Sequence, residues 1–293
     1  MQDCEIGVLG VGRMGRGIAA SYLRAGLPTG VYDVDPGCMH AMAQQEAELA
    51  ESPADLARHC PFISIVVRGE DLEAACAGPN GLFAGLQPGS ILALHTSTPP
   101  AVTKRFAEQA EARGVRVLEA AMTGGVAGAA AGNLTLMCAG DPRLYEDCWP
   151  RLRYIAKRRL YLGSLGTAGV CKAIQDVLFG VYHHTSNEMV QLAIAAGVDP
   201  DRLIDVLNAK GSVAERWTEL WDREGAELVG TKSPTNPRAA VSGFAPWLWA
   251  LAEELGVDVT TSRETVDRSM ALLQEQLRAQ EIGEGKRPQQ RPG

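Results

Sequence analysis

Three glycines at a fixed spacing follow a short apolar segment near the start of the chain. The apolar segment covers residues 5–9, the glycines are Gly10, Gly12 and Gly15, and apolar residues at helical spacing continue over residues 14–25. In a strand–turn–helix unit the first glycine permits the tight turn, the second lets a pyrophosphate approach the backbone, and the third lets the helix pack closely on the strand. The helix N-terminus then offers N–H donors to the phosphates. The pattern predicts a dinucleotide-binding βαβ unit.

An aspartate at the end of the second predicted strand indicates which dinucleotide is bound. Asp33 ends the strand predicted over residues 30–33, 23 residues after Gly10. A carboxylate there accepts hydrogen bonds from the adenosine ribose hydroxyls and repels a 2′-phosphate, so NAD is favoured over NADP. NADP remains the alternative cofactor, because a guanidinium such as that of Arg13 pairs with phosphate. A glycine-rich turn without a ligand is the alternative interpretation of the motif.

Strand-like and helical segments alternate through the first half of the chain. Further strands are predicted over residues 61–67, 90–94, 115–120 and 134–138, and the last of these closes the series. This alternation predicts an α/β fold with a mainly parallel, Rossmann-type doubly wound sheet. After about residue 165 only helical patterns occur, over residues 167–197, 200–207, 213–228, 247–255 and 263–281. We therefore expect a Rossmann domain over residues 1–164, an all-α domain over 165–282, and a disordered Gly- and Pro-rich tail over 283–293.

Composition excludes several classes of protein and partner. The net charge is −7 without a basic stripe, which argues against a nucleic-acid partner. No apolar run reaches the ~18–20 residues that a membrane span needs, and the start carries no secretory signal. The seven cysteines are scattered and odd in number, which is typical of reduced thiols in a cytoplasmic protein and does not suggest a metal site.

Three segments together resemble the β-hydroxyacid dehydrogenase family, which includes 3-hydroxyisobutyrate dehydrogenases and relatives of 6-phosphogluconate dehydrogenase. They are the opening motif through Ala25-Gly26, residues 118–138 with Thr123-Gly124-Gly125, and residues 163–176 with Lys172. The resemblance runs from about residue 5 to about residue 281. It implies a Rossmann domain followed by a helical domain for substrate binding and dimerisation, and hence a homodimer or higher homo-oligomer.

The resemblance also assigns roles to individual residues. It implies that Met14, Val67 and Thr96 contact the cofactor, with Thr96 near the nicotinamide. It implies that Thr123, Gly124 and Gly125 bind the substrate, and open glycine amides are suited to an anion such as a carboxylate. Lys172 is then the general acid/base, since partial burial brings a lysine pKa towards neutrality. A solvated surface lysine is the alternative interpretation.

The long helix predicted after residue 167 carries a polar stripe. Lys172, Asp176, His183 and Asn187 fall on one face, and apolar residues including Ile174 and Leu178 fall on the opposite face. Two interpretations remain open, a helix lining a polar active-site cleft and a helix with a solvated polar side.

Two positions depart from the family pattern. Asp176 stands where the family typically has Asn, and an Asp four residues from Lys172 stabilises the ammonium, which favours proton donation and reduction. Gly243-Phe244 replaces a usual Lys-Asp pair. Trp247, with Phe244 and Trp249, then suits an apolar or aromatic substrate, although core packing is the alternative.

These observations predict an NAD(P)-dependent oxidoreductase that transfers hydride between nicotinamide and a small hydroxyacid or carbonyl substrate. We expect Lys172 to be the general acid/base and Asp176 to modify it. Two alternatives use the same fold: an imine reductase-like enzyme, and a catalytically degenerate dinucleotide-binding protein that acts through protein contacts.

Overall fold

A computed structural model describes residues 2–195, 198–208, 246–247, 249–250, 253–254, 263–268, 270–271 and 274. The chain divides into two compact units, Met1–Ala173 and Ile174–Gly293. The first unit holds every strand of the described residues. The expected domain limits at residues 164 and 282 remain a prediction.

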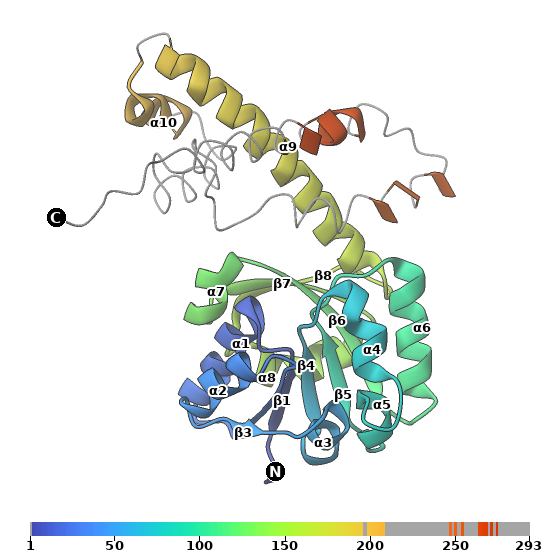
Figure 1. The fold of residues 1–293 in the computed structure, drawn as a ribbon. Coiled ribbons are helices and arrows are strands. Elements are labelled where there is room, and N and C mark those ends of the chain that lie inside the picture. Colours follow the sequence, from blue (N-terminus) through green and yellow to red (C-terminus); the bar gives the residue numbers. More distant parts are fainter. Residues whose placement is uncertain are drawn as a thin grey trace, which may run out of the picture. The chain divides into compact units, whose positions relative to one another are not determined.

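An eight-stranded sheet forms the centre of the first unit, in the order β3-β2-β1-β4-β5-β6-β7-β8 (Figure 1). The strands are β1 (Ile6–Leu9), β2 (Thr29–Tyr32), β3 (Glu48–Leu49), β4 (Phe62–Ile65), β5 (Ile91–Leu94), β6 (Arg116–Thr123), β7 (Leu134–Ala139) and β8 (Ala156–Tyr161). β6 and β7 are antiparallel, and the other neighbouring pairs are parallel. The predicted α/β class with a mainly parallel, Rossmann-type sheet is confirmed.

Helices cover both faces of this sheet (Figure 1). One apolar layer contains residues of α1 (Arg13–Arg24), α2 (Pro36–Ala43), α7 (Gly125–Ala131) and α8 (Pro142–Leu152). The other contains residues of α3 (Pro53–His59), α4 (Leu72–Cys76), α5 (Leu82–Gly85) and α6 (Pro100–Glu111), and a short 3₁₀ helix, η1 (Gly69–Asp71), precedes α4. In β5, Ile91 and Ala93 face the first layer, whereas Leu92 and Leu94 face the second. Burial on both faces explains why the parallel strands read as continuous apolar runs.

The strand series does not end at residue 138, so that prediction is wrong. β8 follows α8 and pairs with β7 alone. Its sequence is AKRRLY, and Lys157 and Arg158 are exposed. An edge strand tolerates charged side chains because one of its edges meets no other strand, so hydrophobic pattern alone does not reveal it. The two-residue β3 lies at the opposite edge of the sheet, and the hydrophobic pattern did not reveal it either.

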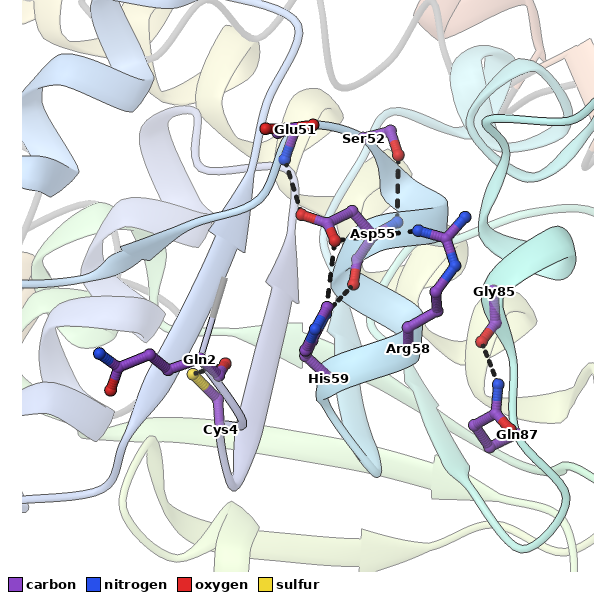
Figure 2. A network of polar contacts seen from close by, with 9 residues as sticks. All are labelled: Gln2, Cys4, Glu51, Ser52, Asp55, Arg58, His59, Gly85 and Gln87. Atoms are coloured by element: carbon purple, nitrogen blue, oxygen red, sulfur yellow. Dashed lines mark hydrogen bonds and ion pairs between the residues drawn. The ribbon is translucent and has the colours of Figure 1, made fainter.

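Side-chain hydrogen bonds hold the start of the helix α3 (Figure 2). The Ser52 hydroxyl oxygen accepts from the Asp55 amide at 3.0 Å, and the Asp55 carboxylate accepts from the Glu51 amide at 3.0 Å. Asp55 also pairs with Arg58 and His59 on the next turn. The Ser52 bond caps the helix by satisfying one of its first amides, and the Asp55 bond holds the residue before the cap, so the contacts around Asp55 are explained by the fold.

Two helices are described beyond the sheet. α9 (Thr167–Ala195) begins in the first unit and continues into the second, and α10 (Pro200–Asn208) follows it. Both agree with the predicted segments. The helix predicted over residues 213–228 and the tail over 283–293 lie outside the described residues. In the described part of the chain, we find no helix that is long and apolar enough to cross a membrane.

Candidate active site

The carboxyl ends of four parallel strands lie in one row across the sheet. Tyr32 pairs with Leu9, Leu9 with Ile65, and Ile65 with Leu94. Open α/β sheets bind ligands at this edge, beyond the strand ends. The loops that leave these strands carry the predicted cofactor residues, so the row locates the candidate site within the first unit.

The glycine motif has the backbone that a dinucleotide requires. Gly10 has φ +90°, and a Cβ on Gly15 would overlap the carbonyl oxygen of Gly10. A Cβ on Gly12 would meet no atom within 4 Å, so this position faces open space. Gly12 precedes α1, where no side chain caps the helix and no acid lies in its first turn. The α1 amides are therefore available to phosphate oxygens, and the residues fit the dinucleotide that the motif predicts.

Asp33 is bound to this glycine motif through its carboxylate. One oxygen accepts from the Val11 amide at 2.7 Å, and the other accepts from the Asp35 amide at 2.9 Å. These bonds hold the carboxylate beside the start of α1, where the sequence predicted it. The structure thus brings Asp33 together with Gly10 and Gly12, although they belong to different βα units.

The loops after β4 and β5 continue the same surface. The Thr96 hydroxyl donates to the Val67 carbonyl at 2.8 Å. A Cβ on Gly10 would lie 3.0 Å from Cγ1 of Val67. Thr96 therefore contacts Val67, and Val67 lies next to Gly10 of the glycine motif. Both are predicted cofactor residues.

The predicted substrate segment forms the turn from β6 into α7. Gly124 and Gly125 have φ values of +126° and +63°, which favour glycine. A Cβ on Gly125 would meet nothing within 4 Å, so its backbone is accessible. Ser21 of α1 donates to the carbonyl of Ala129, within α7, at 3.0 Å. The helix that follows Thr123 and the turn is thereby tied to the helix of the dinucleotide motif.

The start of α9, which carries Lys172, is held by a buried carboxylate that sequence reasoning missed. Glu119 is completely buried, and its two oxygens accept from the amides of Gly166 and Gly169, each at 2.7 Å. Burial raises the pKa of Glu119, and hydrogen bonds from the amides of Gly166, Gly169 and Ala168 act in the opposite direction. The only sign of this role in the sequence was an acidic residue inside a predicted apolar strand.

A second buried polar group next to the strand ends was also missed. His95 is 3% exposed, with Nδ1 2.8 Å from the Ala120 carbonyl and Nε2 3.1 Å from the Ser64 hydroxyl. Burial lowers the pKa of His95 to about 4, so the ring is neutral at pH 7. A carbonyl only accepts, so Nδ1 carries the proton, and Ser64 donates to Nε2. Tyr22, 3.3 Å from Ser64, then donates to the Ser64 oxygen.

The polar stripe of α9 is buried at Asp176 and His183, and Lys172 is half-buried. Asp176 is 6% exposed and His183 is 7% exposed, whereas Ile174 is 44% exposed and Leu178 is 61% exposed. The solvated-side interpretation is therefore wrong for Asp176 and His183. The Asn187 side chain lies outside the described residues.

The tryptophans after residue 245 differ in environment. Trp249 is 7% exposed and packs with Val177 and Val266 in the second unit, so core packing accounts for it. Trp247 is half-buried, and its predicted contact with the substrate remains a prediction. Gly243-Phe244 lies outside the described residues.

Comparison with known proteins identifies the family. The family model for the NAD-binding domain of 6-phosphogluconate dehydrogenase matches residues 5–163. An L-threonate dehydrogenase from Cupriavidus necator is 31% identical over 263 residues, covering 89% of this chain and 84% of that protein. This chain belongs to the β-hydroxyacid dehydrogenase family. It is accordingly an NAD(P)-dependent oxidoreductase acting on CH–OH groups.

Two further β-hydroxyacid dehydrogenases agree with this assignment. The mitochondrial 3-hydroxyisobutyrate dehydrogenase of Rattus norvegicus is 28% identical over 262 residues, covering 89% of this chain and 77% of that protein. The crystal structure of the 3-hydroxyisobutyrate dehydrogenase from Salmonella typhimurium superposes with a TM-score of 0.79 at 23% identity, covering 91% of this chain and 93% of that one. The latter likeness establishes the shared fold.

Proposed function

We propose that this enzyme interconverts a small hydroxyacid and the matching carbonyl compound, with Lys172 as the general acid/base. The placement of the first turn of α9 supports this role. Gly169, three residues before Lys172, is bonded to Glu119 of β6, which pairs with Leu94 in the row of strand ends that also carries the glycine motif. Lys172 is therefore carried by the same edge of the sheet as the cofactor loops.

Each residue has a defined task in this proposal. The glycine motif and Asp33 would hold the dinucleotide, which would supply a hydride acceptor for the carbinol carbon in oxidation and a hydride donor for the carbonyl carbon in reduction. The Lys172 amine takes the hydroxyl proton during oxidation and donates it during reduction. Asp176, four residues along α9, adds a negative charge on the face that carries Lys172 and would repel a substrate carboxylate, which favours the reductive direction. Thr123 and the amides of Gly124 and Gly125 bind the substrate carboxylate, and Trp247 contacts the rest of the substrate.

The same proposal gives the enzyme a preference for NAD over NADP. Asp33 would repel a 2′-phosphate and accept from the ribose hydroxyls, and its bond to Val11 holds it beside the phosphate-binding turn. Arg13 is the residue through which NADP would still bind. We also propose a cytoplasmic homodimer or higher homo-oligomer, since helical domains in this family pair. A monomer in light scattering would refute the oligomer.

The test is a kinetic comparison of the wild type with Lys172→Met. Purified protein is assayed with NAD⁺ and NADP⁺ against L-threonate and 3-hydroxyisobutyrate, the compounds named by the curated relatives, and with NADH against aldehydes and cyclic imines. We expect oxidation of a hydroxyacid, lowered ~10²- to 10⁴-fold in kcat by Lys172→Met. NADH affinity should be unchanged, because that side chain is not in the dinucleotide motif.

Other outcomes separate the alternatives. Full turnover by Lys172→Met would exclude the proposed role. Turnover of cyclic imines alone would identify an imine reductase-like enzyme. Tight NADH binding without turnover of any compound would support a catalytically degenerate protein.

A further inference from the structure

The first turn of α9 takes its acidic partner from a distant strand. Helix starts favour negative charge, because their first amides lack partners within the helix. α9 has no acidic residue in its first turn. Glu119 supplies the missing carboxylate from β6, 47 residues before Gly166 and 50 residues before Gly169. Both oxygens accept an amide, as in the ionised form of the group.

The contact between this turn and the sheet leaves no space for adjustment. A Cβ on Gly169 would lie 3.0 Å from the Glu119 carboxylate oxygen Oε1 and 2.9 Å from the Thr98 carbonyl oxygen. Gly166 has φ +98°, and a Cβ there would lie 2.7 Å from Cβ of Pro100. The two glycines therefore let the turn rest directly on β6 and on the loop after β5.

This geometry determines where Lys172 lies. Lys172 follows Gly169 by three residues, which is about 4.5 Å along the helix axis. Glu119 is completely buried and belongs to a strand paired on both sides, so the carboxylate cannot follow a displaced helix. The Thr98 carbonyl, which is also close to Gly169, belongs to the loop that holds Thr96.

We propose that Glu119 is a positioning residue, whose carboxylate fixes the first turn of α9 and thereby sets the place of Lys172 relative to the strand-end loops. The inference rests on the proposed role of Lys172. It assigns no contact between Glu119 and the substrate. A change at Glu119 should therefore alter catalysis through Lys172 while cofactor binding stays constant.

The main test uses Glu119→Gln, which keeps the size of the side chain. One acceptor oxygen becomes an NH₂ group that faces a backbone N–H, so one of the two bonds is lost. We expect faster amide hydrogen exchange over residues 166–169. We also expect a shifted pH dependence for acetylation of Lys172 by acetic anhydride, measured by mass spectrometry. With L-threonate or 3-hydroxyisobutyrate, kcat should fall about 10- to 100-fold, with the Kd for NADH unchanged.

A second pair of variants tests the fit of the turn. Glu119→Asp keeps the charge but shortens the side chain by one methylene, and Gly169→Ala places a methyl group against the same carboxylate. Each change alone should reproduce the altered labelling of Lys172. Because the shorter acid makes room beside residue 169, the double variant should lose less activity than the product of the two single losses.

Asp141→Asn is the matched control. The Asp141 carboxylate oxygen Oδ1 accepts from the amides of Arg143 and Leu144 at the start of α8, at 2.6 and 3.0 Å. It is the same kind of contact at a helix that carries none of the predicted site residues. This control should lower thermal stability and leave the labelling profile of Lys172 and kcat unchanged.

The outcomes distinguish this inference from the proposed function. Unchanged exchange and unchanged Lys172 labelling in Glu119→Gln would overturn the positioning role, whatever the substrate. If Lys172→Met loses turnover while Glu119→Gln keeps its kcat and pH profile, only the positioning role fails. If Lys172→Met keeps turnover, the proposed function fails first. If Glu119→Gln does not fold, Glu119→Asp and Gly169→Ala test the positioning role by the same two measurements, amide hydrogen exchange and acetylation of Lys172.

Discussion

The carboxylate of Asp33 accepts a hydrogen bond of 2.7 Å from the backbone amide of Val11, inside the glycine motif. The contact joins the end of β2 to the turn after β1, so the residue proposed to bind the ribose also shapes the turn proposed to bind the phosphates. Its second oxygen is held by the Asp35 amide at 2.9 Å. Cofactor affinity and cofactor choice are therefore coupled through one side chain.

Replacing Asp33 by alanine should weaken NADH binding and relax the discrimination against NADPH. A hydrogen bond to a charged group contributes about 1.5–3 kcal/mol, so we expect the Kd for NADH to rise about 10- to 100-fold. The Kd for NADPH should change less, because the repulsion of the 2′-phosphate is removed at the same time. Fluorescence titration of both nucleotides measures the ratio, with Asp141→Asn as control. An unchanged ratio would contradict the role of Asp33.

Gly12→Ala should weaken NADH binding, whereas Gly15→Ala should lower the stability of the fold. A Cβ at residue 12 meets no protein atom within 4 Å, so Gly12→Ala should keep the wild-type Tm and bind NADH at least ~10-fold more weakly. A Cβ at residue 15 overlaps the Gly10 carbonyl oxygen, so Gly15→Ala should lose about 1–3 kcal/mol of stability. Thermal denaturation and NADH titration of the pair check this. Normal NADH affinity in Gly12→Ala would remove the argument for phosphate binding there.

Acid should destabilise the folded protein through His95. The folded-state pKa of about 4 lies below the ordinary value of 6.5. Below pH 6.5 the unfolded chain therefore binds a proton that the folded chain does not. The free energy of unfolding should fall as the pH drops from about 6.5 to about 4, by up to ~3 kcal/mol from this residue.

Guanidinium titrations at pH 7 and pH 4.5 measure that change. His95→Asn should be less stable at pH 7 and should show a smaller decrease on acidification, by ~2–3 kcal/mol. His40→Asn, at an exposed position, is the control and should keep the wild-type decrease. Equal pH dependence in wild type and His95→Asn would show that His95 does not titrate as described.

Asp176→Asn should favour the oxidative direction. Removing a carboxylate four residues from Lys172 takes away a negative charge that attracts the ammonium and repels a substrate carboxylate. We expect kcat for hydroxyacid oxidation at pH 7 to increase ~2- to 10-fold. Initial rates in both directions measure this. A variant that oxidises hydroxyacids no better than the wild type counts against the role of Asp176.

The parts of the fold that were predictable follow local rules. The glycine motif and Asp33 depend on backbone requirements within one βα unit and its neighbour, and the structure brings them together as expected. The central strands were recognisable because both of their faces are buried. The burial of Asp176 was one of two open interpretations, because helical spacing shows which residues share a face but not what covers it.

The parts that were missed depend on partners far away in the sequence. The pattern of β8 is charged because it is an edge strand, and only the whole sheet shows which strand is at the edge. Glu119 and His95 appeared as isolated polar residues in apolar runs. Their partners, such as Gly169 and Ala120, are 50 and 25 residues away, so no local pattern could identify the contacts.

The bonds of Glu119 to Gly166 and Gly169 also bear on the order of assembly during translation. All eight strands precede residue 166, so the sheet can pair before the start of α9 has left the ribosome. Until then the Glu119 carboxylate lacks its amide partners, and a charged group of this kind stays in contact with water. Docking of the first turn of α9 supplies those partners, so the burial of Glu119 waits for this helix.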